Sequence, residues 1–375
     1  MIGVSKTFGG SSILSSPVNK PRYLPGFFVF GGRGNMIKEE RVRIIDIAEE
    51  LGLSTATVSN VIHGKTKKIS DRTVQMVQQK LEERHYIPNM AGLLLAQNNS
   101  RIIGVVVKDH EKYEGHVLED PFIASSMNYL ADEIERAGKF MMLKKAKDIM
   151  EIVTFASMWN LDGLVVLSFC TDEYQTLRNQ IHIPFVVYDG YFDNQGRICN
   201  IMIDDRDGGR QMGQHFRELG HERVLCISDN KICMDLARYE GFCQGFGAKT
   251  AFMMIPMQQE ERRRFYEQHL EELTSYTAIF AVSDYYAIDL MRFLTGHGIR
   301  IPEDISVAGF DSNPICEQTI PKLTSVYQDG RERAVMAIGL LGKMMEDAQY
   351  TENIVAPVQL IVRDSTAKYT KQTKM

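Results

Sequence analysis

Residues 42–63 read VRIIDIAEELGLSTATVSNVIH, and this stretch decides the fold of the amino-terminal part of the chain. Apolar residues recur at helical spacing in each half, at Ile44, Ile45, Ile47, Ala48 and Leu51 and then at Val58, Val61 and Ile62. This spacing predicts two short helices. Gly52 suits the tight turn between them, and Ser54 suits the amino-terminal cap of the second. The stretch is therefore predicted to be a helix-turn-helix.

The outward face of the second helix carries Thr55, Ala56, Ser59 and Asn60. These side chains are small or carry an amide, so they can lie close to base edges in the major groove of DNA. The alternative, an ordinary helical hairpin in a protein core, gives no reason for such a face. We expect Asn60 to read an adenine, and Thr55 and Ala56 to touch thymine methyl groups. The expected DNA-contacting residues of this region are Ser54, Thr55, Ala56, Thr57, Ser59, Asn60 and His63.

Two further helices are predicted downstream of this motif. The first spans 71–84, with Ser70 as its cap and an apolar face of Val74, Val77 and Leu81. The second lies in HYIPNMAGLLLAQ at 85–97, where Pro88 suits a first helical turn. A helix so short and apolar is marginal alone in water, so it needs a partner. The partner is a second copy of itself or DNA, unless the segment is a linker helix packed on its own domain.

Seven blocks of the chain, in order, resemble the lac-repressor (LacI/GalR) family of bacterial transcription regulators. They are DIAEELGLSTATVSNVI, HYIPNMAGLLLA, IGVVV at 103–107, IDDRDGGRQMGQHFRELGHERV at 203–224, ARYEGF at 237–242, VSDYYAIDLMRFLTGHGIRIPEDISVAGFDS at 282–312 and PKLTSVYQD at 321–329. The resemblance runs from about residue 42 to 364. It implies a DNA-binding regulator, not an enzyme, that acts as a symmetric homodimer on a pseudo-palindromic operator.

The resemblance also assigns roles to the segment after the headpiece. It implies a hinge helix with DNA contacts from Asn89, Leu95 and Ala96. Leu95 matches a leucine that wedges into the minor groove and bends the duplex. Ala96 stands where the purine-repressor branch has lysine, so minor-groove hydrogen bonding is not expected there. The carboxyl-terminal tail lacks the leucine heptads of tetrameric members, which favours a dimer.

From Arg101 onward, short apolar segments alternate with amphipathic ones, which predicts parallel α/β sheets. Strands are predicted at 102–107, 139–143, 163–167, 184–188, 223–228, 251–255, 277–282 and 305–309, and helices at about 122–137, 149–159, 207–219, 258–273, 284–296 and 329–346. The resemblance implies a periplasmic-binding-protein-like core of two such lobes around a ligand cleft. We expect one lobe near 101–200 plus a stretch around 321–330, and the other near 201–320 plus the carboxyl-terminal part. The expected fold is thus an α/β two-lobed core with an all-α helix-turn-helix headpiece.

Candidate effector-binding residues follow the predicted strands, because ligands of such sheets bind beyond the carboxyl ends of the strands. Matching family positions give Phe122, Asp189, Arg238, Ser283, Asp284 and Asp311, with Ser283 where many relatives carry Asn. If Arg238 and Asp311 come from facing loops, a ligand between them would bias the orientation of the lobes. Two alternatives stay open. In the first, Arg238 and Asp311 form a structural ion pair across the cleft and do not bind a ligand. In the second, Asp189 and Asp284 cap turns or helices.

Composition narrows the remaining possibilities. The six cysteines, at 170, 199, 226, 233, 243 and 316, include no CxxC pair, and the nine histidines lack ligand spacing. We therefore expect no metal site, no cofactor and reduced thiols in a cytoplasmic protein. No apolar run is long enough to cross a membrane. The net charge is −5, and its acidic excess lies after residue 100, so only the headpiece is expected to approach phosphate. Lys144, Lys145 and Lys147 are expected on a solvated face after the second strand.

The expected organisation is a disordered extension or upstream mis-start at 1–35, a headpiece at 36–84, a hinge helix and linker at 85–100, and the core at 101–375. The expected function is a sequence-specific regulator, acting as a repressor, whose operator affinity changes with a sugar or another small metabolite. The alternatives are control by a protein partner and a non-regulatory small-molecule-binding protein on the same lobes. The sequence leaves open the effector, the operator and whether the effector releases the protein from DNA or tightens its binding.

Overall fold

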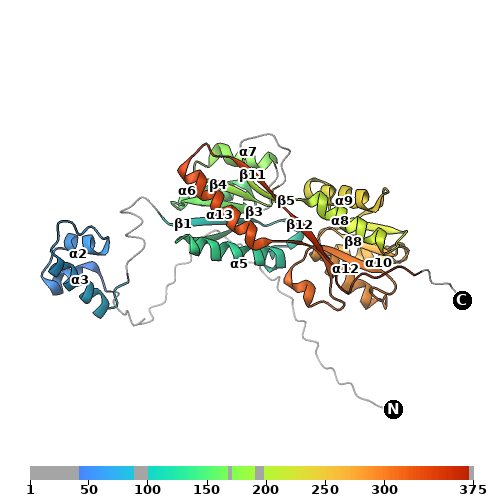
Figure 1. The fold of residues 1–375 in the computed structure, drawn as a ribbon, viewed down its shortest axis with the longest axis horizontal. Helices are drawn as coiled ribbons and strands as arrows, with labels where there is room; N and C mark the ends of the chain where they lie inside the picture. Colours follow the sequence, from blue (N-terminus) through green and yellow to red (C-terminus); the bar gives the residue numbers. More distant parts are fainter. Residues whose placement is uncertain (1–41, 88–99, 168–170, 191–197, 371–375) are drawn as a thin grey trace, which may run out of the picture. The chain divides into compact units, whose positions relative to one another are not determined.

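The computed structural model describes residues 42–87, 100–167, 171–190 and 198–370, and the chain divides after Pro88 into two compact units (Figure 1). The first unit is helical and the second is α/β. The predicted boundary at residue 35 and most of the hinge at 85–100 lie outside the described residues. Asn89, Leu95 and Ala96 lie there too, so their predicted DNA contacts stay predictions.

The helical unit contains α1 (Ile44–Leu51), α2 (Thr55–Ile62) and α3 (Asp71–Glu83). Its core is formed by Ile47, Ala48, Val58, Val61 and Val77, which are all buried. Gly52 ends α1 with a φ of 63°, in the left-handed region that glycine adopts without strain. The helix-turn-helix prediction is confirmed. The prediction that Ile45 belongs to the buried face of the first helix is wrong, because Ile45 is 44% exposed and contributes little to the core.

The first lobe of the α/β unit is a six-stranded parallel sheet in the order β11-β5-β4-β3-β1-β2. Its strands are β1 (Ile102–Lys108), β2 (Phe140–Ala146), β3 (Gly163–Leu167), β4 (Phe185–Tyr188), β5 (Cys199–Ile203) and β11 (Glu352–Ala356). Two short 3-10 turns, η1 (Glu111–Tyr113) and η2 (Val117–Glu119), follow β1. Helices α5 (Pro121–Arg136) and α13 (Gly330–Glu346) lie side by side on one face (Figure 1), and α6 (Ile149–Met158) and α7 (Thr171–Gln180) cover the other.

The second lobe repeats this layered plan with the strand order β12-β10-β9-β8-β6-β7. Its strands are β6 (Val224–Ser228), β7 (Ala251–Met254), β8 (Ala278–Ala281), β9 (Ser306–Asp311), β10 (Thr324–Gln328) and β12 (Val358–Ile361), of which β12 is antiparallel to β10. Helices α10 (Gln259–Gln268), α11 (Leu270–Thr274) and α12 (Asp284–Gly296) pack on one face. Helices α8 (Asp205–Glu218) and α9 (Cys233–Phe246) pack on the other, and the turn η3 (Pro314–Glu317) follows β9.

The chain passes between the lobes after β5, after β10 and between β11 and β12. The expected lobe boundaries are wrong for the stretch around 321–330, because β10 pairs with β9 in the second sheet. Helix α13 and strand β11 then return to the first lobe. Each lobe is therefore built from two separate stretches of the chain, with a stretch of the other lobe between them in the sequence. No local sequence pattern specifies this arrangement.

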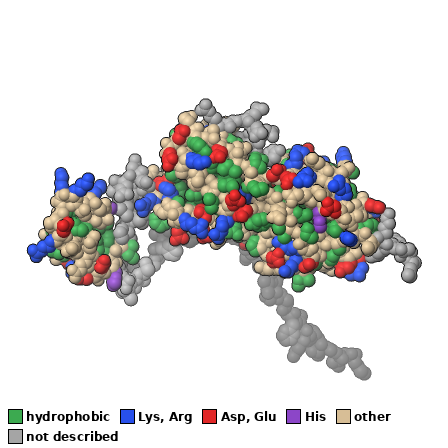
Figure 2. Space-filling model, in the orientation of Figure 1, with side chains coloured by type: hydrophobic (Ala, Val, Ile, Leu, Met, Phe, Trp, Pro, Cys, Tyr) green, Lys and Arg blue, Asp and Glu red, His purple; other side chains and the backbone are tan. Residues whose placement is uncertain are grey.

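Several elements differ from their predicted bounds. Strands β5, β10, β11 and β12 and helices α7 and α9 were not predicted as such, and the helix predicted at 258–273 is broken at His269. Lys144 and Lys145 lie within β2 and pair with Glu151 and Asp109, so they are not simply a solvated cluster after that strand. Acidic and basic side chains are otherwise intermixed over the visible face of the two lobes (Figure 2).

Candidate functional site

The second helix of the headpiece presents a polar face. Ser54 caps α2, since its Oγ accepts a hydrogen bond of 3.1 Å from the backbone N–H of Thr57. The predicted contact residues divide into two groups. Exposed are Ser54, Thr55, Ala56 and Asn60, and partly buried are Thr57, Ser59 and His63. The exposed group lies at the start of α2 and one turn further on, where a helix end can enter a groove.

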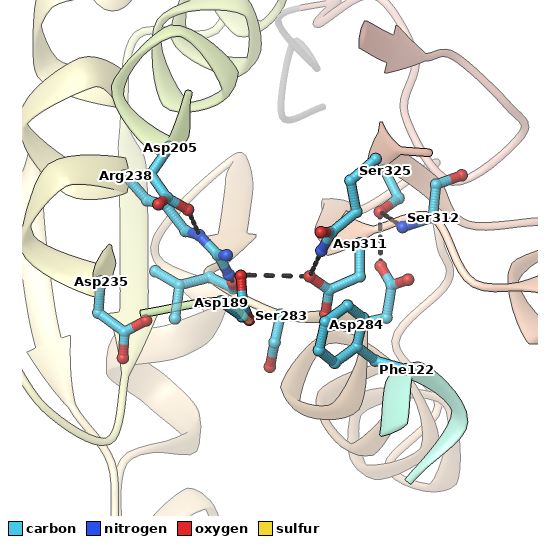
Figure 3. Close-up of polar contacts among 12 residues, drawn as sticks. Phe122, Asp189, Asp205, Asp235, Arg238, Ser283, Asp284, Asp311, Ser312 and Ser325 are labelled. Carbon is cyan, nitrogen blue, oxygen red and sulfur yellow. Dashed lines mark hydrogen bonds and ion pairs between the residues drawn. The ribbon is translucent and has the colours of Figure 1, made fainter. Parts of the chain in front are cut away.

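Several residues of the second lobe face the cleft between the lobes. Arg238 lies at the centre of this group, and its side chain is buried (Figure 3). It lies in the second turn of α9, and its Nε donates to Asp205 Oδ1 at 2.8 Å, while its Nη1 donates to the Val282 carbonyl at 2.6 Å. Its guanidinium lies 3.8 Å from the ring centroid of Phe310. Burial raises the pKa of Asp205 to about 6, although Arg238 opposes that rise. Asp205 and Arg238 therefore form a desolvated pair that holds the guanidinium in one orientation.

Asp311 is the last residue of β9, and its φ of 107° is a strained backbone conformation for a non-glycine residue. Its Oδ1 accepts from Gln328 Nε2 at 2.8 Å and lies 3.9 Å from Arg238 Nη1. Burial raises the pKa of Asp311 well above its usual range, and Arg238 opposes this. Arg238 and Asp311 belong to the same lobe, so the expectation that they come from facing loops is wrong.

The first lobe supplies Asp189 and Phe122 to the cleft. Asp189 follows β4 with a φ of 66°, and its Oδ1 accepts from Arg333 Nη2 of α13 at 2.8 Å. The Arg333 guanidinium in turn lies 4.4 Å from the ring centroid of Tyr188 and 5.7 Å from that of Phe122. Arg333 is fully buried, so it fixes the position of Asp189 at the strand end.

Five of the six predicted effector residues line one cavity of about 80 Å³ between the lobes, namely Phe122, Asp189, Arg238, Ser283 and Asp311. Ser283 also caps α12, because its Oγ accepts a hydrogen bond of 3.4 Å from the N–H of Tyr286. Elements distant in sequence thus bring polar groups from both lobes to the carboxyl ends of their strands, where α/β sheets bind ligands.

Asp284 does not line this cavity, because its carboxylate is directed into the second lobe. It accepts from Ser325 Oγ at 2.5 Å, from the N–H of Asn313 at 2.9 Å and from Cys316 Sγ at 3.1 Å. Burial raises its pKa to about 6, while these hydrogen bonds oppose the rise. Asp284 therefore joins α12 to η3 and β10. The structure favours the structural alternative for this residue, although the bonds differ from a simple helix cap.

Helices α8 and α9 approach each other through glycines, and this contact positions Arg238. Cβ atoms added at Gly209 or Gly241 would lie 2.0 and 1.9 Å from backbone carbonyl oxygens of the facing helix. Gly213 and Gly245 make equally close approaches one turn further on. The two backbones are in direct contact, so the side chain of Arg238 is held at a fixed distance from Asp205 on α8.

Comparison with known proteins assigns both units. Residues 43–89 match the model of bacterial regulatory proteins of the lacI family, and residues 214–366 match the periplasmic binding protein-like domain. The chain is 28% identical to the HTH-type transcriptional repressor PurR of Vibrio atlanticus, over 87% of this chain and 98% of the relative. It is 27% identical to the HTH-type transcriptional regulator DegA of Bacillus subtilis, with the same coverage of both chains.

Solved structures show the same fold. The lac repressor dimer bound to operator and the anti-inducer ONPF matches with a TM-score of 0.75, at 22% identity over 88% of this chain and 100% of that one. The chain is a LacI-family transcriptional regulator. A LacI-family regulator from Enterococcus faecium with bound ribose matches with a TM-score of 0.62, at 25% identity over 72% of this chain and all of that one.

Membership of the LacI family settles the class of activity. The protein is a DNA-binding transcriptional regulator and not an enzyme, as the sequence predicted. Of the helices that the structure describes, none has both the length and the apolar character that crossing a membrane requires.

Sequence reasoning missed several charged residues that line the cleft of this LacI-family core or lie buried behind it. Arg333 carried a usable signal, because it continues the buried stripe of Ala337, Leu340 and Leu341 on α13, where an unpaired arginine would be costly. Lys112, Asp229 and Asp235 gave no such signal. Lys112 of the first lobe meets the two aspartates of the second lobe only when the lobes are assembled.

Proposed function

We propose that this LacI-family regulator is a cytoplasmic homodimer that binds a pseudo-palindromic operator as a repressor, and that a small polar metabolite in the interlobe cleft changes its operator affinity. The observation that carries the effector part is the convergence of Phe122 and Asp189 from one lobe with Arg238 and Asp311 from the other around one cavity. A ligand touching both lobes has different contacts in each of their relative orientations, which is what coupling to a distant site requires.

The DNA part of the proposal rests on the exposed face of α2. Thr55, Ala56 and Asn60 are free of the headpiece core, and the helix is fixed by the Ser54 cap and by Val58 and Val61 beneath it. A rigid helix with small residues at its start can approach base edges closely, and an Asn one turn on can make a bidentate contact with adenine. Two such headpieces on a symmetric dimer favour a palindromic site.

A sugar is the leading class of effector in the proposal. A cellobiose complex and ribose complexes occur among the structurally similar regulators. Carboxylates and a guanidinium at the strand ends suit the hydroxyl groups of such a ligand, because each can bond more than one hydroxyl. The same cleft also suits other hydroxyl-rich metabolites of similar size.

Selection from a random duplex library with the full-length protein tests the DNA part. We expect enrichment of a palindromic site, and with Asn60→Ala a relaxed preference at one base pair of each half-site. Lys249→Ala, which changes an exposed residue of the other unit, is the matched control. Operator affinity is then measured by fluorescence anisotropy with and without a panel of sugars. If no sequence is enriched, sequence-specific regulation is refuted. An operator affinity that no panel member changes would count against a sugar as effector.

A further inference from the structure

The loop after β1 belongs to the first lobe and reaches the surface of the second. It spans residues 109–120 and includes η1 and η2. The ring centroid of Tyr113 lies 6.1 Å from that of Tyr285 on α12, in an edge-on arrangement. At the base of the loop, Lys145 of β2 pairs with Asp109 at 3.3 Å and donates to the Gly115 carbonyl. The loop is therefore attached to its own sheet and rests on the opposite lobe.

Lys112 extends from this loop into the interlobe cavity. Its Nζ lies 4.8 Å from the ring centroid of Tyr113 and 6.0 Å from that of Tyr286, which belongs to the second lobe. Lys112, both tyrosines and Arg238 line the same cavity of about 80 Å³. An ammonium beside two aromatic faces gains cation–π attraction, which is stronger where water is excluded.

The surroundings of Lys112 are acidic on both lobes. Five carboxylates and two cations are among the described residues that line the cavity: Asp120, Asp189, Asp229, Asp235 and Asp311, with Lys112 and Arg238. Burial alone lowers the pKa of Lys112, but Tyr113, Asp229, Asp235 and Asp120 outweigh it and raise the pKa above the usual range of a lysine. The ammonium is thus a charged group that the negative charges of carboxylates on both lobes favour.

The second-lobe carboxylates are held in place by their own neighbours. Asp235 Oδ2 accepts from Ser228 Oγ at 2.9 Å and from Asn230 Nδ2 at 2.7 Å, and Asn230 also donates to Asp229 Oδ1 at 2.8 Å. Tyr286 is 1% exposed, and burial together with the neighbouring Asp229 raises the pKa of its hydroxyl above the usual range of a tyrosine. The Tyr286 hydroxyl and the Asp229 carboxylate therefore lie together at the edge of the cavity that both residues line.

We propose that Asp229, Asp235, Tyr113 and Tyr286 form an ammonium subsite of the effector cleft, that Lys112 fills it in the unliganded chain, and that the effector carries a protonated amine which replaces Lys112. This inference rests on the proposed effector function and adds the chemical class of the ligand. The cavity left beside Lys112 is small, so a ligand of sugar size fits only when the lysine side chain withdraws. The excess of carboxylates disfavours a phosphorylated or carboxylate ligand, because like charges repel strongly in a desolvated site.

The test removes the lysine side chain and supplies it again as a free molecule. n-Butylammonium has the same four-carbon stem and ammonium as lysine. With full-length Lys112→Ala, we expect n-butylammonium chloride to raise the thermal unfolding midpoint saturably by about 2–4 °C at a concentration tenfold above its Kd. n-Butanol and sodium chloride at matched concentration should have no such effect. Wild type and Lys249→Ala, the matched control, should not respond, since Lys112 is present in both.

Equal responses of wild type and Lys112→Ala, or equal effects of butanol and butylammonium, would overturn the subsite. A second measurement covers the case in which Lys112→Ala does not fold. Reductive methylation of wild-type protein followed by peptide mass spectrometry should modify Lys112 at least about tenfold more slowly than the exposed Lys249, and equal rates would refute its occupancy of the subsite. Operator affinity, measured in parallel, separates the two proposals. Butylammonium binding without any change in operator affinity would leave the subsite standing and contradict effector control through it.

Discussion

The glycine contact between α8 and α9 yields a sharp prediction. Gly241→Ala should lower the free energy of unfolding, because the added Cβ would lie 1.9 Å from the carbonyl oxygen of Arg206. Real Cβ atoms do not approach a backbone oxygen so closely, and neither helix can remove the clash by changing a rotamer. The helices must separate, which places the loss at the upper end of the range for overpacked cores, about 3 kcal/mol. Arg238, three residues earlier on α9, would move away from Asp205.

The matched control is Gly342→Ala in the interior of α13, where an added Cβ meets nothing within 4 Å. Alanine is the better helix former there, so this variant should gain about 0.5–1 kcal/mol. Urea unfolding followed by circular dichroism measures both variants. The same added methyl group should therefore lower the free energy of unfolding at Gly241 and raise it at Gly342. A Gly241→Ala protein that unfolds at the wild-type midpoint would show that α8 and α9 are not in backbone contact, and the account of how Arg238 is positioned would fail with it.

Three more predictions concern the headpiece, the buried ion pair and pH. Asn60→Ala should cost about 1–3 kcal/mol of operator binding at one base pair per half-site, and a base-substitution scan that gives unchanged preferences would contradict the assignment. Arg238→Ala should lower the free energy of unfolding by about 3–5 kcal/mol, because it leaves Asp205 buried without its partner; a urea midpoint near that of wild type would disprove this. The pKa of Asp284 is raised from 3.8 to about 6, so the folded state holds an extra proton between these pH values. Stability should therefore fall as pH rises from about 4 through 6, and Asp284→Asn should flatten that fall in unfolding measured across the window.

Much of the helical unit could be predicted because its information is local. The spacing of Ile47, Ala48, Val58 and Val61, the glycine turn and the Ser54 cap all act within a few residues of one another, and the structure reproduces them. Ile45 was assigned to the core because it is apolar, but its direction from the helix axis places it in solvent. Apolar identity is weaker evidence than angular position.

Helix α9 shows why one element of the core was missed. Its glycine-rich face packs on the backbone of α8 and its aromatic face packs on the sheet, so it is buried on more than one side and lacks a clear polar stripe. Helical periodicity is read from the contrast between polar and apolar faces, and here that contrast is weak. Strands β11 and β12 were missed for a related reason, since they are short and partly exposed.

By itself, the sequence determined the class of the protein, the helix-turn-helix, the layered α/β core and five residues of the cleft, because these depend on local periodicity and on blocks of matching residues. Only the tertiary structure decided which lobe contains α13 and which contains β10. It also decided that Arg238 pairs with Asp205 and lies in the same lobe as Asp311, and that the carboxylate of Asp284 is directed into the interior. It also placed Lys112 among the acids of the opposite lobe. The physical reason is that burial and charge pairing depend on which chain segments meet, and segments that are distant in the sequence meet only through packing.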